Sequence, residues 1–170
     1  DAAVAFLEAG IHVICDKPLS VSQAEGARIK KTLQNSSAKF FLTHNYTGYP
    51  LIREAREMIA NGKLGHIRVV QAEYAQDWLA EPLETTGQKQ ASWRTDPKAT
   101  GGGGAIGDIG THAYNLVHYV TGLEVQELAA DLTSYVPGRA VDDNAHIWLR
   151  YTGGAKGQLW ISQVAVGNEN

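Results

Sequence analysis

Asp108 and His112 stand four residues apart in the stretch GGGGAIGDIGTHAYNL. In a helix this spacing puts both side chains on one face, one turn apart. A carboxylate beside an imidazole suits acid–base chemistry, because His titrates near neutral pH and Asp can orient and stabilise its protonated ring. A structural interpretation competes with this one: Asp108 or Thr111 caps a helix, and His112 is a satisfied core residue. The four glycines favour the catalytic interpretation, because they would let the backbone approach a ligand closely. Both interpretations stay open.

Two other stretches carry side chains that are typical of binding sites. In CDKP, Lys17 and Pro18 follow an expected parallel strand, at the end where α/β sheets present their ligand sites. The alternative is a solvated lysine before a proline turn. In SWRTDP, Trp93 offers a flat surface and Arg94 a planar donor fork for phosphate or carboxylate, although a loop anchor and a surface charge would give the same letters.

A metal site is the natural competitor for Asp108 and His112. His118 is six residues from His112, so the two imidazoles would point in different directions on one helix. Cys15 belongs to another element, and the sequence has no CxxC or HExxH. We therefore expect no metal. No GxSxG signals a serine nucleophile.

Residues 1–45 alternate between helix and strand. A short apolar helix precedes the strand 11–15, which is apolar enough to be buried on both faces. Ser22 and Glu25 form a capping box that opens a second helix, and the strand 39–45 follows it. This order predicts a parallel α/β unit.

From residue 46 the pattern changes to a helix near 50–62 and longer strands with one polar face. The expected strands are 66–78, 125–136 and 144–151, and a turn at TGGAKG leads into one more, QLWISQVAV, as an antiparallel hairpin. A helix is expected over 111–121. Residues 79–104 show little periodicity and predict a long loop that is functional or disordered.

We therefore predict an α/β protein in two parts. Residues 1–45 would be the C-terminal part of a Rossmann-type parallel α/β domain, without its N-terminal part. Residues 46–170 would form an α+β domain with a largely antiparallel sheet, truncated at its C-terminus. Because the sequence lacks an initiator methionine and stops just after a strand, we expect a fragment with sequence missing at both ends.

The composition narrows the possible partners. The 170 residues are 44% hydrophobic and 19% charged with a net charge of −3, which is typical of a globular protein. No apolar run approaches the roughly 20 residues of a membrane span, and the basic residues are scattered, so we expect neither membrane nor nucleic acid as a partner. The single cysteine, Cys15, excludes an internal disulfide and favours a reducing, cytoplasmic location.

Taken in order, EAGIHVICDKPLS, NY and WRTDP…GGGGAIGDIGTHA resemble the glucose–fructose oxidoreductase/inositol dehydrogenase (Gfo/Idh/MocA) family across the whole chain. That family carries E-K-P after a strand of its dinucleotide-binding domain and G-G-x-x-x-D-x-G-x-H in its second domain. The resemblance implies an NAD- or NADP-dependent oxidoreductase that transfers a hydride from a sugar, cyclitol or related polyol hydroxyl. Relatives that cleave glycosidic bonds through transient redox, or that sense NAD(P) or sugar without catalysis, are the alternatives.

The resemblance also assigns roles to residues. It implies a catalytic set of Lys17, Asp108 and His112 beside the nicotinamide. It implies cofactor contacts for Asp16, Lys17, Pro18, Asn45, Trp93 and Arg94, and substrate contacts for Lys17, Tyr46, Asp108 and His112. Asp16 departs from the family, which usually has Glu before the lysine.

The stretch GGGGAIG is not the dinucleotide fingerprint, because it does not follow a buried strand within a βαβ unit. The residues that choose between NAD and NADP would lie upstream of the sequence. A homo-oligomer is expected through the aromatic-bearing face of the second sheet, with Trp148 and Trp160. The alternative is that sequence missing from the fragment covers this face.

Overall fold

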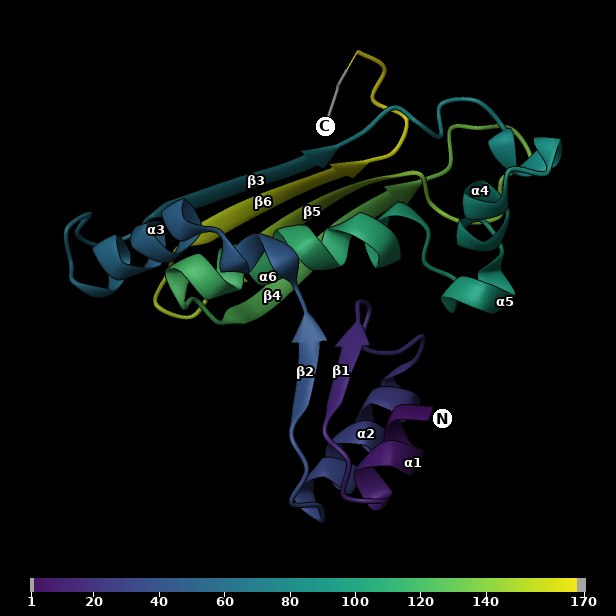
Figure 1. The fold of residues 1–170 in the computed structure, drawn as a ribbon. Coiled ribbons are helices and arrows are strands. Elements are labelled where there is room, and N and C mark those ends of the chain that lie inside the picture. The colour runs from purple at the N-terminus through teal and green to yellow at the C-terminus, as the bar shows by residue number, and fades with distance from the viewer. Residues whose placement is uncertain (1, 168–170) are drawn as a thin grey trace. The chain divides into compact units, whose positions relative to one another are not determined.

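The computed structural model describes residues 2–167, and the chain forms two compact units, Asp1–Asn45 and Tyr46–Asn170 (Figure 1). The first unit holds two helices and two parallel strands: α1 (Ala2–Glu8), β1 (Val13–Asp16), α2 (Gln23–Gln34) and β2 (Phe40–Thr43). The capping box at the start of α2 is present. Ser22 Oγ accepts from the Glu25 N–H at 3.3 Å, and the Glu25 carboxylate accepts from the Val21 N–H at 3.2 Å. The predicted parallel α/β unit is confirmed.

One face of this small sheet is covered. Val13 packs with Leu7 and Ala38 in a buried cluster that residues of α1 and α2 complete. On the opposite face Ile14 is 77% exposed and Phe41 58% exposed. The prediction that the first strand is buried on both faces is therefore wrong for the described chain. Both helices that pack on the pair lie on the side of Val13, and side chains alternate between faces along a strand.

The second unit is built from a four-stranded sheet and the helices packed on it. The short helix η1 (Asn45–Gly48) begins at the last residue of the first unit and leads into the second. The elements that follow are α3 (Pro50–Ala60), β3 (Val69–Ala75), η2 (Leu83–Thr86), α4 (Lys89–Arg94), α5 (Pro97–Thr100), η3 (Ile106–Gly110), α6 (Thr111–Thr121), β4 (Val125–Thr133), β5 (Asn144–Tyr151) and β6 (Lys156–Ser162). The strand order is β3-β6-β5-β4. The pairs β4–β5 and β5–β6 are antiparallel and β3–β6 is parallel, so the sheet is largely antiparallel as predicted.

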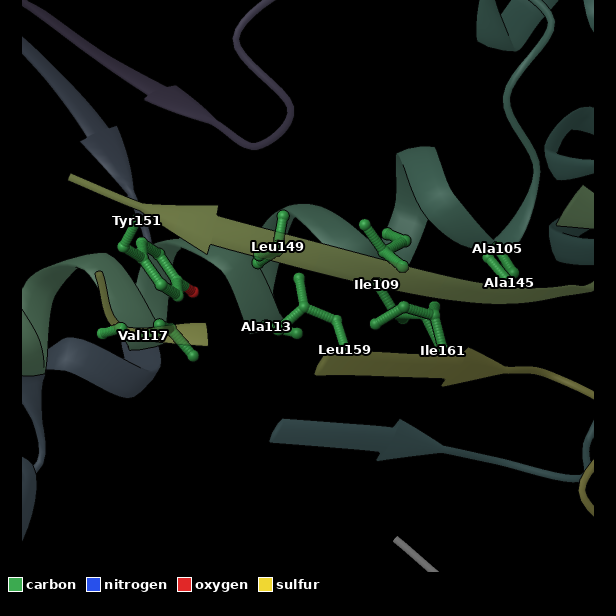
Figure 2. Close-up of a cluster of buried hydrophobic side chains, with 11 residues drawn as sticks. Ala105, Ile109, Ala113, Val117, Ala145, Leu149, Tyr151, Leu159 and Ile161 are labelled. Atoms are coloured by element: carbon green, nitrogen blue, oxygen red, sulfur yellow. The ribbon is translucent and has the colours of Figure 1, made fainter. Parts of the chain in front are cut away.

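A row of helix side chains four residues apart forms the core with the sheet. Figure 2 shows this row facing side chains of β5 and β6. The helix contributes Ala105, Ile109, Ala113 and Val117, and the strands contribute Ala145, Leu149, Tyr151, Leu159 and Ile161. In Figure 1, α6 lies along one face of the sheet with α3 beside it. This packing fixes the helix that carries Asp108 and His112 against the sheet. No helix among residues 2–167 is long and apolar enough to cross a membrane.

Residues 79–104 are more ordered than their composition suggests, because η2, α4 and α5 lie within them. A buried guanidinium holds the start of this segment. Arg139 donates to both carboxylate oxygens of Glu84 at 2.9 Å, to the Leu79 carbonyl at 2.9 Å and to the Asp143 carboxylate at 3.1 Å. Its hydrogen bond to Glu84 lowers the pKa of that carboxyl group. The segment is thus pinned to the connection between β4 and β5.

The glycine run serves internal contacts. Gly101 ends α5 in the left-handed conformation, with φ of 72°, and Gly102 follows with φ of 92°. Gly104 lies against residue 142: its N–H donates to the Asp142 carboxylate at 2.7 Å, and a Cβ at Gly104 would lie 2.0 Å from the Asp142 carbonyl oxygen. The sequence suggested close approach of a ligand, whereas the structure shows close approach of the neighbouring backbone at Gly104.

We expect Gly104→Ala to lower the free energy of unfolding by about 1–3 kcal/mol or more, because the new methyl group would displace the backbone at Asp142. Gly107→Ala is the matched control, since a Cβ there meets nothing within 4 Å. The control should be neutral or raise the free energy of unfolding by up to about 1 kcal/mol. Urea unfolding of both variants checks this, and equal destabilisation of the two would contradict it.

Candidate active site

Asp108 and His112 lie where a π turn runs into an α-helix. The turn is η3, which carries Asp108, and α6 begins directly after it with His112 in its first turn. The predicted helix over 111–121 is confirmed, and its helical path starts before Ile109, so the two side chains lie one turn apart. Single π turns inside helices are frequent at functional sites.

The alternative interpretation, in which Asp108 or Thr111 caps a helix, does not match the structure. The N-cap residues of η3 and α6, Ala105 and Gly110, provide no side-chain cap, and Thr111 Oγ1 donates back to the Gly107 carbonyl at 3.4 Å. The carboxylate of Asp142 takes the capping role, because it accepts from the Gly104 N–H at 2.7 Å and the Ile106 N–H at 2.8 Å. Asp108 is therefore not needed as a cap.

The Asp108 carboxylate is held by two donors on one oxygen. Arg94 Nε and Gln163 Nε2 each donate to Asp108 Oδ2 at 3.0 Å. The side chain of Asp108 is 14% exposed and that of Arg94 22% exposed, so the ion pair is largely shielded from water. Charge-assisted bonds in such surroundings are stronger than neutral ones, and they fix the carboxylate in one orientation.

Arg94 is itself held by aromatic rings and an amide. Its guanidinium carbon lies 4.2 Å from the ring centroid of Trp93 and 5.8 Å from that of Trp78. Its Nη1 donates to the carbonyl and the side-chain oxygen of Gln90. Arg94 thus links α4 to Asp108, and the cofactor contacts predicted for Trp93 and Arg94 stay predictions.

His112 is enclosed by two tyrosines and is only 8% exposed. The ring of Tyr46 stands edge-on to it, with centroids 4.9 Å apart, and the ring of Tyr74 lies at 6.1 Å. The two tyrosine hydroxyls are hydrogen-bonded at 2.6 Å. The structure therefore brings Tyr46, predicted as a substrate contact, beside the predicted catalytic imidazole.

In the first unit, the remaining predicted residues follow the carboxyl ends of β1 and β2. Thr43 Oγ1 donates to the Asp16 carboxylate at 2.7 Å, across the parallel pair. Lys17 and Pro18 come next, joined by a cis peptide bond, and Asn45 begins η1 after the second strand. A cation and polar groups at this edge suit a dinucleotide, which α/β sheets bind at the carboxyl ends of their strands.

Comparisons with known proteins agree with this two-part arrangement. Residues 52–170 match the GFO/IDH/MocA C-terminal domain, and residues 1–44 match an oxidoreductase family with an NAD-binding Rossmann fold. The chain belongs to the GFO/IDH/MocA oxidoreductase family.

Solved structures and a curated relative support the family assignment. An inositol dehydrogenase homolog complexed with NAD+ from Azotobacter vinelandii is 37% identical with a TM-score of 0.92, over 98% of this chain and 43% of that one. An oxidoreductase from Sinorhizobium meliloti is 54% identical with a TM-score of 0.84, over 99% and 43%. Levoglucosan dehydrogenase from Pseudarthrobacter phenanthrenivorans is 28% identical over 100% of this chain and 48% of its own length. The chain thus spans less than half the length of these proteins.

Several residues of the candidate site were not predicted from the sequence. Gln163 follows the last strand, and Asp142 stands just before β5, with no local pattern that marks either. Tyr74 lies near the end of β3 and reads as an ordinary strand residue. A possible signal is the acidic pair Asp142-Asp143 before an apolar alternating strand, since buried carboxylates need donors.

His44 gives a pH test of the strand-end environment in the first unit. Burial, and secondarily the charge of Lys17, lower the pKa of His44 below its usual 6.5. The unfolded chain then binds a proton that the folded protein resists. The stability that comes from a neutral His44 is therefore fully present above pH 6.5. The free energy of unfolding falls as the pH drops from 6.5 to the lowered pKa.

NMR titration of the imidazole in the full-length protein, assigned with His44→Gln, should give a pKa below 6.5. Lys17→Met should raise that pKa without restoring it fully, because burial is the larger cause. A value at or above 6.5 in the unmodified protein would contradict this description of the strand ends.

Proposed function

We propose that the protein is an NAD- or NADP-dependent oxidoreductase that transfers a hydride from a sugar, cyclitol or related polyol hydroxyl to nicotinamide. The observation that carries the proposal is the Asp108–His112 pair, one helical turn apart, with the carboxylate fixed by Arg94 and Gln163. The names of the similar proteins, which refer to inositol and levoglucosan, support the substrate class.

Oxidation of an alcohol removes a hydride from carbon and a proton from oxygen. We assign the proton to His112, because a neutral imidazole is a suitable base near pH 7 and the two tyrosines restrict its ring. Asp108, one turn earlier, supplies a fixed negative charge that favours the protonated ring. This division of roles needs a carboxylate that does not reorient, and the two bonds to its Oδ2 provide that.

Lys17 is the third proposed catalytic residue. Its ammonium group would stabilise the negative charge that develops on the substrate oxygen as the proton leaves. Lys17 stands at the strand end where Asp16 is already bonded across to Thr43, so its backbone position is set by the parallel pair.

A nicotinamide cofactor supplies the hydride acceptor when it is bound. Asp16, Lys17, Pro18 and Asn45 are the described residues of the first unit that we propose hold it. Trp93 and Arg94 are proposed contacts from the second unit. The hydrogen bond from Arg94 to Asp108 favours a role toward that carboxylate over direct binding of the cofactor.

We also propose a cytoplasmic homo-oligomer that uses the outer face of the second sheet. Trp148 is 52% exposed on that face. The Trp160 ring stacks on His146 at 6.3 Å, and its Nε1 donates to Asn144. A flat aromatic surface of this kind suits contact with a second copy.

The test measures reduction of NAD and NADP at 340 nm by the full-length protein with a panel of sugars and inositols. Lys17→Met, Asp108→Asn and His112→Gln should each lower kcat by about 10²- to 10⁴-fold, the range expected of acid–base and electrostatic groups. His118→Gln is the matched control, because His118 lies on the same helix with its side chain 41% exposed.

Two outcomes would contradict the proposal. Full activity of Asp108→Asn and His112→Gln would remove the pair from the chemistry. Nucleotide binding without reduced cofactor for any polyol would instead favour a redox-recycling glycosidase or a sensor, and hydrolysis of a glycoside would separate these two.

A further inference from the structure

We propose that Gln163 is a positioning residue for the candidate active site, because it holds the Asp108 carboxylate from the sheet side. This inference rests on the proposed role of Asp108. It adds a residue that lies outside every pattern in the sequence from which the site was predicted.

Gln163 is almost fully buried, at 2% exposure, and its backbone is fixed at both polar atoms. Its N–H donates to the Asp143 carbonyl at 2.9 Å, and its carbonyl accepts from the Leu79 N–H at 3.0 Å. The residue directly follows β6, so the sheet sets its position. The side chain is then directed to a single partner in the described structure, Asp108 Oδ2 at 3.0 Å.

The chemistry of this contact has one direction. An ionised carboxylate only accepts hydrogen bonds, so the amide nitrogen of Gln163 must face Asp108 and its oxygen must face away. Arg94, the other donor to the same oxygen, comes from α4 and is partly exposed. Arg94 therefore contributes charge from the long connecting segment, and Gln163 contributes a fixed direction from the buried end of β6.

If Gln163 only supported the local fold, its backbone hydrogen bonds would be sufficient for that role. Those bonds to Asp143 and Leu79 do not involve the side chain, so a side-chain substitution leaves them in place. What such a substitution removes is the hydrogen bond from Gln163 Nε2 to Asp108 Oδ2. The expected consequence is a looser carboxylate and weaker stabilisation of the protonated imidazole, which affects turnover more than substrate binding.

Gln163→Leu in the full-length protein tests the contact. Loss of a hydrogen bond to a charged group should lower kcat by about 10- to 100-fold, while KM changes by less than about threefold. The melting temperature is measured in parallel, so that a loss of folded protein is not read as a loss of turnover.

Gln163→Glu gives a readout that a structural role would not produce. Near neutral pH the new carboxylate would face Asp108 and repel it, whereas the protonated acid could donate as the amide does. Relative to the unmodified protein, its kcat should therefore recover as the pH falls, and that of Gln163→Leu should not. Gln34→Glu makes the same change at the exposed last residue of α2, and should leave kcat and its pH profile unchanged.

The outcomes separate this inference from the proposed function. If Asp108→Asn loses activity but Gln163→Leu keeps the unmodified kcat, the inference is overturned and the function stands. If Asp108→Asn is fully active, the proposed function fails. If Gln163→Glu does not fold, Gln163→Leu alone decides, because its kcat either falls as stated or does not.

Discussion

Two adjacent buried carboxylates, Asp142 and Asp143, hold the second unit in the form that the candidate site requires. Asp142 accepts from the N–H groups of Gly104 and Ile106 and so fixes the start of the helical path that carries Asp108. Asp143 is fully buried and bonds to Arg139, which pins the segment leading to α4. A buried carboxylate without donors is costly, so each bond constrains both of its partners.

The candidate site is assembled from elements that these bonds bring together. The helical path supplies Asp108 and His112, and the segment that Arg139 pins leads to Arg94. Strand β5 follows the Asp142–Asp143 pair and lies beside β6. Gln163, directly after β6, is thereby placed within hydrogen-bonding distance of Asp108. Arg94 and the Gln163 amide both donate to Asp108 Oδ2, and aromatic rings border the His112 imidazole.

The elements whose formation depends on nearby residues were predicted from the sequence. The helix over 111–121 and the strand 144–151 were predicted with their observed bounds. Their signals are apolar periodicity and, for the helix, the glycine that ends it, and both can be recognised within a few residues of sequence. Arg139 and Gln163 had no such signal, since groups that their side chains bond lie as many as 60 residues away along the chain. The ordered helices within 79–104 escaped prediction for the same reason, because a distant guanidinium anchors that segment.

The most direct test of the central claim is a crystal structure of the full-length protein with reduced cofactor and a polyol that it oxidises. We predict that the reacting hydroxyl oxygen lies about 2.6–3.2 Å from a ring nitrogen of His112, with Asp108 still hydrogen-bonded to Arg94 and Gln163. A hydroxyl group that points away from His112, together with loss of the hydrogen bonds from Arg94 and Gln163 to Asp108, would contradict this assignment.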